Sequence, residues 1–228
     1  LILTISFVIV IFGAIIAGNR MPFVLLVFAM ILVLFFEKSS RKYLVPLISV
    51  FLIVFTITFK FNSNVNVHFH NFYEKTERIT NTFINGFSDF KNPVFNSHYK
   101  EFYTGYITWK QNKFFGGGMK SFRTNCSKKL VNCGNHPHNY YLEILSDLGL
   151  FGLLILSIIF IKILYDSFIK KYFNKSILRY NHVITPFMFL FFVEIFPIKT
   201  TGSFFTTANA TYFFLVMAVT IALSKKKI

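Results

Sequence analysis

The stretch LGLFGLLILSIIFI, residues 148–161, carries no charged side chain and is followed at once by Lys162. A helix needs about 20 largely apolar residues to cross the bilayer core, and fewer are enough where a lysine at its end reaches the interface. The stretch therefore predicts a helix that spans a membrane. A soluble globular domain is the poorer interpretation of a chain that contains it.

Five other stretches fit the same template. They are residues 1–17, 21–36, 43–59, 183–197 and 203–224. The chain of 228 residues is also 54% hydrophobic and 20% aromatic, which is more apolar than a typical soluble domain. We therefore expect an all-α, multi-pass transmembrane protein with six spans. Because Leu1 already stands inside an apolar stretch, we also expect further helices upstream of it.

The formal net charge of +15 raises the question of a nucleic-acid partner, but the location of the charge favours a membrane. Basic residues gather between the second and third spans, between the fourth and fifth, and after the sixth. They are Lys38, Arg41 and Lys42, then Lys170, Lys171, Lys175 and Arg179, and finally Lys225, Lys226 and Lys227. Short cytoplasmic loops carry such an excess of Lys and Arg. We expect these clusters inside the cell, the lipid bilayer as a partner, and no nucleic acid.

The same topology divides the chain into three parts. We expect three spans in residues 1–59, a periplasmic loop with the functional motif in residues 60–147, and three spans with a cytoplasmic tail in residues 148–228. The loop is rich in Phe and Tyr, unlike a disordered linker, and it is too long to be a simple connection. We expect it to be partly helical, with helices at residues 74–90 and 99–113.

Both cysteines, Cys126 and Cys133, fall in this external loop. Outside the reducing cytoplasm a disulfide between them is the favoured interpretation, and it would close a short loop. A zinc site completed by His136 and His138 is an alternative, but the spacing matches no common zinc pattern. Two buried free thiols are the third alternative. We therefore expect no metal here.

The densest polar stretch is NHPHN, residues 135–139, at the external start of the fourth span. Histidine has the side chain whose ordinary pKa lies closest to neutrality, so His138 can accept a proton from an attacking hydroxyl. In isolation such a pair of histidines is more often a helix cap or a loop contact. A second pair, His68 and His70, has no motif around it, and we expect a loop or interface role for it.

The sequence after the histidines resembles a known family. In O-antigen ligases a histidine and a polar neighbour typically precede a spaced pair of glycines, and here nine residues separate the two pairs. The four residues are His138, Asn139, Gly149 and Gly152. Three further stretches are similar to features of the wider O-antigen ligase and O-antigen polymerase family: AGNR at 17–20, FGGGMKSFR at 115–123, and the last external loop at 196–207. The matches run from the first span to the last.

This resemblance implies a metal-independent glycosyltransferase of the C-type helical membrane class, without a cofactor. It also implies the bacterial inner membrane, with the active site facing the periplasm. The implied donor is an undecaprenyl-diphosphate-linked glycan. The implied acceptor is lipid A-core for a ligase, another glycan for a polymerase, or a protein in a third variant of the family.

The resemblance implies a role for five residues in particular. His138 would be the catalytic group that activates or orients the acceptor hydroxyl. Arg20 and Arg123 would hold the diphosphate, because a guanidinium makes forked, charge-assisted contacts with phosphate oxygens. His136 and Asn139 would also bind substrate.

The sequence departs from the family pattern just before Gly149, where Asp147 is followed by Leu148 instead of a small residue. The acid is kept, and no role for Asp147 is assumed. Another acid, Glu194, lies near the outer end of the fifth span, where an ionisable group is costly. We expect it to pair with a cation such as Lys199.

Two other classes of protein stay open on the sequence. One is a transporter or channel whose external loop is a lid, which would place polar side chains in several spans. Five of the six predicted spans are essentially free of charge. The other is a membrane scaffold without catalytic activity, in which replacing His138 would leave glycan assembly intact.

Overall fold

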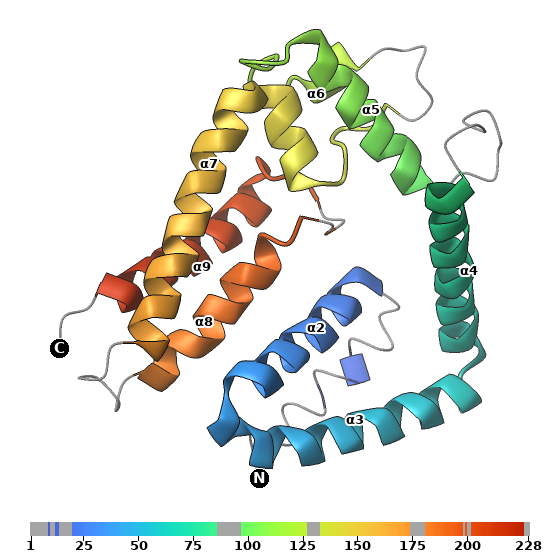
Figure 1. The fold of residues 1–228 in the computed structure, drawn as a ribbon. Helices are drawn as coiled ribbons and strands as arrows, with labels where there is room; N and C mark the ends of the chain where they lie inside the picture. Colours follow the sequence, from blue (N-terminus) through green and yellow to red (C-terminus); the bar gives the residue numbers. More distant parts are fainter. Residues whose placement is uncertain are drawn as a thin grey trace. The chain divides into compact units, whose positions relative to one another are not determined.

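The computed structural model describes residues 20–85, 97–126, 133–173, 181–197 and 202–225, together with residues 9, 12, 13 and 199. Within these residues every regular element is a helix, and there is no strand (Figure 1). The expected all-α fold is thus confirmed for this part of the chain. Two compact units can be distinguished, Leu1–Asn92 and Pro93–Ile228.

The first unit contains the helices α2 (Arg20–Phe36), α3 (Arg41–Phe61) and α4 (Ser63–Asn85), with the short 3₁₀ helix η1 (Lys38–Ser40) after α2. Arg41 closes the turn, since its guanidinium donates to the carbonyls of Leu34 at 2.7 Å and Phe35 at 3.1 Å. These carbonyls belong to the last turn of α2, where acceptors have no partner within the helix. Arg41 of the basic cluster therefore also caps an apolar helix.

Helix α4 begins at Ser63, so the predicted start at residue 74 was wrong. The side chain of Asn62 accepts the Val65 N–H at 3.2 Å and starts the helix. Val65 is buried, and Phe69, four residues later on the same face, lies edge-on against Phe55 at 5.1 Å between ring centroids. The polar residues between them concealed this apolar face in the sequence.

In the described part of the chain, three helices are long and apolar enough to cross a membrane: α3, α7 (Tyr140–Tyr172) and α9 (Thr207–Lys225). Helix α2 and helix α8 (Asn181–Glu194) contain shorter apolar segments. These five helices overlap five of the six predicted spans, while the span expected at 1–17 falls almost entirely outside the described residues. The number of spans and their inside and outside ends stay predictions.

The second unit is built from α5 (Ser97–Gln111), the short α6 (Phe122–Asn125) and the bundle of α7, α8 and α9. The prediction of a helix at 99–113 is confirmed by α5, within two residues at each end. Aromatic side chains fill the centre of the bundle. The fully or nearly fully buried ones are Tyr140, Phe160, Phe191, Phe204 and Phe213. Their rings meet mostly edge to face, the arrangement that aromatic pairs prefer.

Candidate functional site

Helix α7 is bent at Gly149, the first glycine of the histidine motif. Gly149 has φ 70° and ψ −168°, a conformation that is essentially restricted to glycine. In a straight helix the N–H groups of residues 150 and 151 would donate to the carbonyls of residues 146 and 147. The bend opens this pairing, so these four backbone groups need other partners.

The partners come from residues 113–122, which we call the glycine strap. Four backbone hydrogen bonds join the strap to the bend, two in each direction. They run from Gly117 N to Ser146 O (2.8 Å), from Gly118 N to Asp147 O (2.9 Å), from Leu150 N to Lys113 O (2.9 Å) and from Phe151 N to Phe114 O (3.2 Å). The bend in α7 and the strap therefore form a single structural element.

The close approach of these two backbones explains the glycines. A Cβ atom on Gly149 would lie 2.3 Å from the Phe114 carbonyl oxygen, and one on Gly116 would lie 2.4 Å from the Asp147 carbonyl. A Cβ atom on Gly152 would lie 2.3 Å from Cβ of Leu148, which the bend brings against the next turn. The glycines of the strap and the spaced glycines of the motif thus allow the same close approach of two backbones.

Asp147 fixes the far end of the strap. Its side chain is fully buried, and its two carboxylate oxygens accept the N–H of Lys120 at 2.6 Å and of Phe122 at 3.1 Å. The hydroxyl groups of Ser121 and Ser146 also donate to it, at 3.2 Å and 3.4 Å. A buried carboxylate is stable only when such donors surround it. Asp147 therefore has a structural role that the sequence did not indicate.

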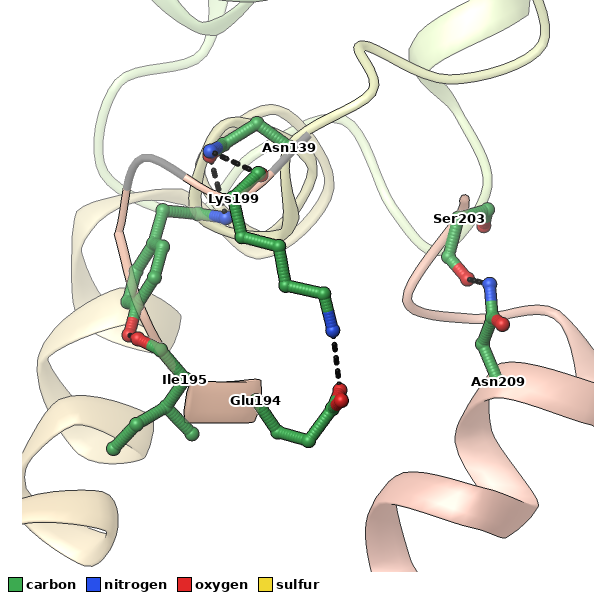
Figure 2. Close-up of polar contacts among 7 residues, drawn as sticks. Asn139, Glu194, Ile195, Lys199, Ser203 and Asn209 are labelled. Atoms are coloured by element: carbon green, nitrogen blue, oxygen red, sulfur yellow. Dashed lines mark hydrogen bonds and ion pairs between the residues drawn. The ribbon is translucent and has the colours of Figure 1, made fainter. Parts of the chain in front are cut away.

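Asn139 starts α7 and ties it to the segment after α8. Its side-chain oxygen accepts the N–H groups of Tyr141 at 3.0 Å and Leu142 at 3.1 Å, as an N-cap residue does. Its amide nitrogen donates to the carbonyl of Pro197 at 2.7 Å and to that of Lys199 at 3.3 Å, the second of which Figure 2 shows. These bonds use both polar atoms of the side chain. They give Asn139 a positioning role, and the substrate contact expected for it stays a prediction.

A second buried carboxylate, Glu143, holds the segment that precedes α9. It accepts the hydroxyl of Ser203 at 2.5 Å and the N–H of Phe204 at 2.6 Å. The carbonyl of Ser203 in turn accepts the side-chain amide of Asn209 in α9 at 2.9 Å. The helix within the predicted sixth span therefore begins at Thr207, because the residues before α9 form a turn around Ser203.

Glu194 and Lys199 form the ion pair that was expected, with 2.5 Å between Nζ and the carboxylate (Figure 2). The Lys199 ammonium also lies 5.5 Å from the ring centroid of Tyr140. Next to this pair, the hydroxyl of Tyr141 donates to the carbonyl of Ile195. The end of α8 is thereby fixed against the start of α7.

His138 stands immediately before this start. Its backbone has φ 52°, which is uncommon for a residue other than glycine. Its Nε2 lies 3.6 Å from a carboxylate oxygen of Glu101, and its ring centroid lies 4.2 Å from that of His136. The side chain of Glu101 is 16% exposed and that of His138 is 36% exposed. The imidazole thus faces both a carboxylate and open space.

Glu101 reaches His138 because one face of α5 is built from small residues. Thr104 and Thr108 are buried there, and Gly105 allows the helix to approach Pro137 closely. A Cβ atom on Gly105 would lie 2.8 Å from Cβ of Pro137. Glu101 stands one turn before Thr104 on the same face. Sequence reasoning missed Glu101, although this spacing of small residues after an acid was a signal.

The remaining predicted site residues fall in different parts of the chain. Arg123 is exposed on α6, which packs against both α5 and α7. Arg20 begins α2 in the first unit. Cys126 and Cys133 form a disulfide with 5.8 Å between their Cα atoms, which is the favoured one of the three alternatives. His68 and His70 are exposed on α4, where His70 lies 3.3 Å from Glu74.

Comparison with known proteins gives one match. A family model described as O-antigen ligase matches residues 5–157, which is more than half of the chain. The match includes both arginines, the strap, the histidines and the bend in α7. Neither the proteins of curated function nor the solved structures provide a match.

Proposed function

This chain belongs to the O-antigen ligase family, and from that membership we propose that it joins an undecaprenyl-diphosphate-linked glycan to an acceptor. The reaction serves the assembly of O-antigen or another surface polysaccharide. The observation that carries the proposal is the His138 and Glu101 pair at the entrance of α7, inside the matched region. We place the protein in the bacterial inner membrane with this entrance facing the periplasm.

The proposed transfer uses His138 as the general base. The acceptor hydroxyl attacks the anomeric carbon of the donor, and its proton passes to the imidazole. A carbon–oxygen bond forms to the acceptor, while the bond from the anomeric carbon to the diphosphate breaks and the diphosphate leaves with the electron pair. Glu101 orients the imidazole and stabilises its protonated form, as a carboxylate does for a catalytic histidine.

The departing diphosphate needs positive charge, because its own charge grows in the transition state. We propose Arg123 and Arg20 for this role. Arg123 supports it by its exposed position on α6, directly after the strap. His136, whose ring lies tilted against that of His138, is proposed to contact the glycan, and Asn139 to hold the entrance in shape. Since these residues supply both the base and the positive charge, the proposed reaction needs no metal and no cofactor.

Complementation tests the proposal. The complete protein, as wild type or as His138→Ala, is expressed in a strain that lacks its own ligase or polymerase, and the surface glycan is examined on a gel. We expect loss of transfer in His138→Ala with normal protein in the membrane. His68→Ala is the matched control, because His68 is an exposed histidine of α4 outside the motif. Unchanged glycan with His138→Ala would exclude the catalytic role.

The same gel distinguishes a ligase from a polymerase. In the His138→Ala strain, uncapped lipid A-core together with accumulated carrier-linked polymer would identify the protein as a ligase. Single repeats attached to the core, without longer chains, would identify a polymerase. Addition of EDTA to a membrane assay tests the metal independence, and we expect transfer to continue.

A further inference from the structure

Four large apolar side chains lie exposed where the strap meets α7, and we call them the aromatic patch. They are Phe114 (57% exposed), Phe115 (78%), Met119 (66%) and Phe151 (50%). The ring of Phe151 lies 6.1 Å from that of Phe114 and 5.2 Å from that of Phe115, measured between centroids. Exposure of so much clustered apolar surface to water is unfavourable and usually marks a surface that binds something apolar.

The length of α7 places the patch at a definite depth. The helix has 33 residues, about 50 Å at 1.5 Å per residue, whereas the bilayer core is about 30 Å thick. The part after Gly149 is about 35 Å long and ends in Lys170 and Lys171. Lys162 and Asp166 lie within it and pair with each other at 3.3 Å, and long lysine side chains reach toward the headgroups, so this part suits one span with a basic end. The bend at Gly149 therefore lies at the opposite boundary of the bilayer core, and the strap that is bonded to it lies there too.

The exposed apolar surface continues from the patch down this span. After Phe151, the side chains of Leu154, Ile155 and Ile158 are exposed on successive turns of α7. In an integral membrane protein such a stripe faces lipid. The patch is thus the upper end of a surface that already faces the bilayer.

The charges of the strap also suit a position next to the bilayer. Lys113 and Lys120 are exposed at its two ends, and residues 113–122 contain no acidic side chain. A belt of apolar side chains flanked by lysines is typical of segments that lie in the headgroup region of a bilayer.

We propose that the aromatic patch inserts into the interface of the surrounding phospholipid bilayer, with Lys113 and Lys120 at the level of the lipid phosphates. The strap is then an anchor that holds the bend of α7 and the adjoining α6 at the membrane surface. This inference follows from exposure, helix length and charge, and it holds whichever reaction the protein catalyses.

A spin label measures this depth directly. Phe115→Cys is labelled with a nitroxide in the complete protein, reconstituted in vesicles of phosphatidylethanolamine and phosphatidylglycerol. Collisions of the label with oxygen, which enters the bilayer, are compared with collisions with a water-soluble nickel chelate. Cys126 and Cys133 are bonded to each other and do not react without a reductant. Ile158→Cys serves as the control in the middle of the span, and Asn135→Cys as the control in an exposed loop.

We expect the label at residue 115 to lie about 5–10 Å below the phosphates, shielded from nickel although less deeply than at residue 158. Met119→Cys is the second site, and we expect the same shielding there. Access of nickel to residues 115 and 119 equal to that at residue 135 would overturn the proposal. So would shielding that develops only after carrier-linked glycan is added, because the patch would then bind substrate and not the surrounding bilayer.

Discussion

Glu101 in α5 places a carboxylate oxygen 3.6 Å from Nε2 of His138, the residue that immediately precedes the cap of α7. The contact joins two segments that lie on either side of the glycine strap and the disulfide. It gives the histidine of the motif a partner that the motif itself does not contain. Replacement of either residue should therefore affect the same step of the reaction.

Glu101→Gln should slow transfer without unfolding the protein. The amide keeps the size of the side chain but no longer stabilises a protonated imidazole, so we expect kcat to fall about 10-fold to 100-fold, less than the loss of a general base. The KM for the donor should change little. Glu77→Gln is the matched control, since Glu77 is exposed on α4. Equal rates for both variants would remove Glu101 from the mechanism.

Gly149→Ala should break the contact between α7 and the strap. The new Cβ would meet the Phe114 carbonyl at 2.3 Å, and φ 70° with ψ −168° is strained for alanine. Strain and clash together should lower the free energy of unfolding by more than about 3 kcal/mol. Thermal unfolding in detergent measures the effect. Gly134→Ala is the control, because a Cβ there would have its nearest neighbour at 3.8 Å, and we expect its midpoint to be that of the wild type.

Asp147→Asn should loosen the strap at its far end. An asparagine presents an NH₂ group to one of the two backbone N–H donors, so a charge-assisted bond is lost and a donor faces a donor. We expect a loss of about 2–3 kcal/mol in stability and faster tryptic cleavage after Lys120. Glu77→Gln is the control, because Glu77 is an exposed acid of α4 and its replacement should leave stability and cleavage unchanged. Equal cleavage of the two variants would contradict the assignment.

Substitutions at Asn139 should separate its two functions. Asn139→Ser keeps an N-cap but loses the bonds to Pro197 and Lys199, whereas Asn139→Ala loses both. Loss of the cap alone costs about 0.5–2 kcal/mol. Hydrogen exchange of the Tyr141 and Leu142 amides should increase in the alanine variant and stay slow in the serine variant. Fast exchange in both would mean that the cap is not what protects these amides.

Reduction of the disulfide should lower the stability of the second unit. Cys126 and Cys133 are separated by 7 in sequence, and opening a loop of this size costs about 2–3 kcal/mol in the chain-entropy description. We expect dithiothreitol to lower the unfolding midpoint of the wild type. The double variant Cys126→Ser, Cys133→Ser should start at the lower midpoint and not respond to dithiothreitol. A response of the double variant would show that the reductant acts elsewhere.

The apolar helices were predictable from the sequence because their composition is set by the solvent that surrounds them. Residues 148–161 have to be apolar along their whole length, because the whole length lies in an apolar environment. The first and last residues of the helices were less predictable where a polar side chain forms hydrogen bonds with a distant segment. Ser203 looks like the start of a span, yet it is held outside α9 by Glu143. Residues 63–73 look like a loop, yet Val65 gives them an apolar face.

The candidate site was predictable only in part, for a related reason. The histidines and the glycines stand in a pattern that can be recognised along the chain. Glu101 and Asp147 act through contacts with distant segments, and the sequence shows neither contact. The approach of Gly105 to Pro137 had to be known before Glu101 could be placed beside His138. The catalytic role of His138 and the substrate roles of the arginines stay predictions.

The four bonds between the strap and the bend of α7 also affect how the protein is made. Residues 113–118 are synthesised before α7, and on the proposed topology they have to cross the membrane before they can bind Ser146, Asp147, Leu150 and Phe151. Until these bonds form, α7 has to stay straight. Backbone groups in lipid need hydrogen-bond partners within the same segment, and only a straight helix supplies all of them. Insertion of a straight helix and its later bending by the strap are thus separate steps in biogenesis. On the proposed topology, the second step completes the surface around His138 only after residues 60–147 have crossed the membrane.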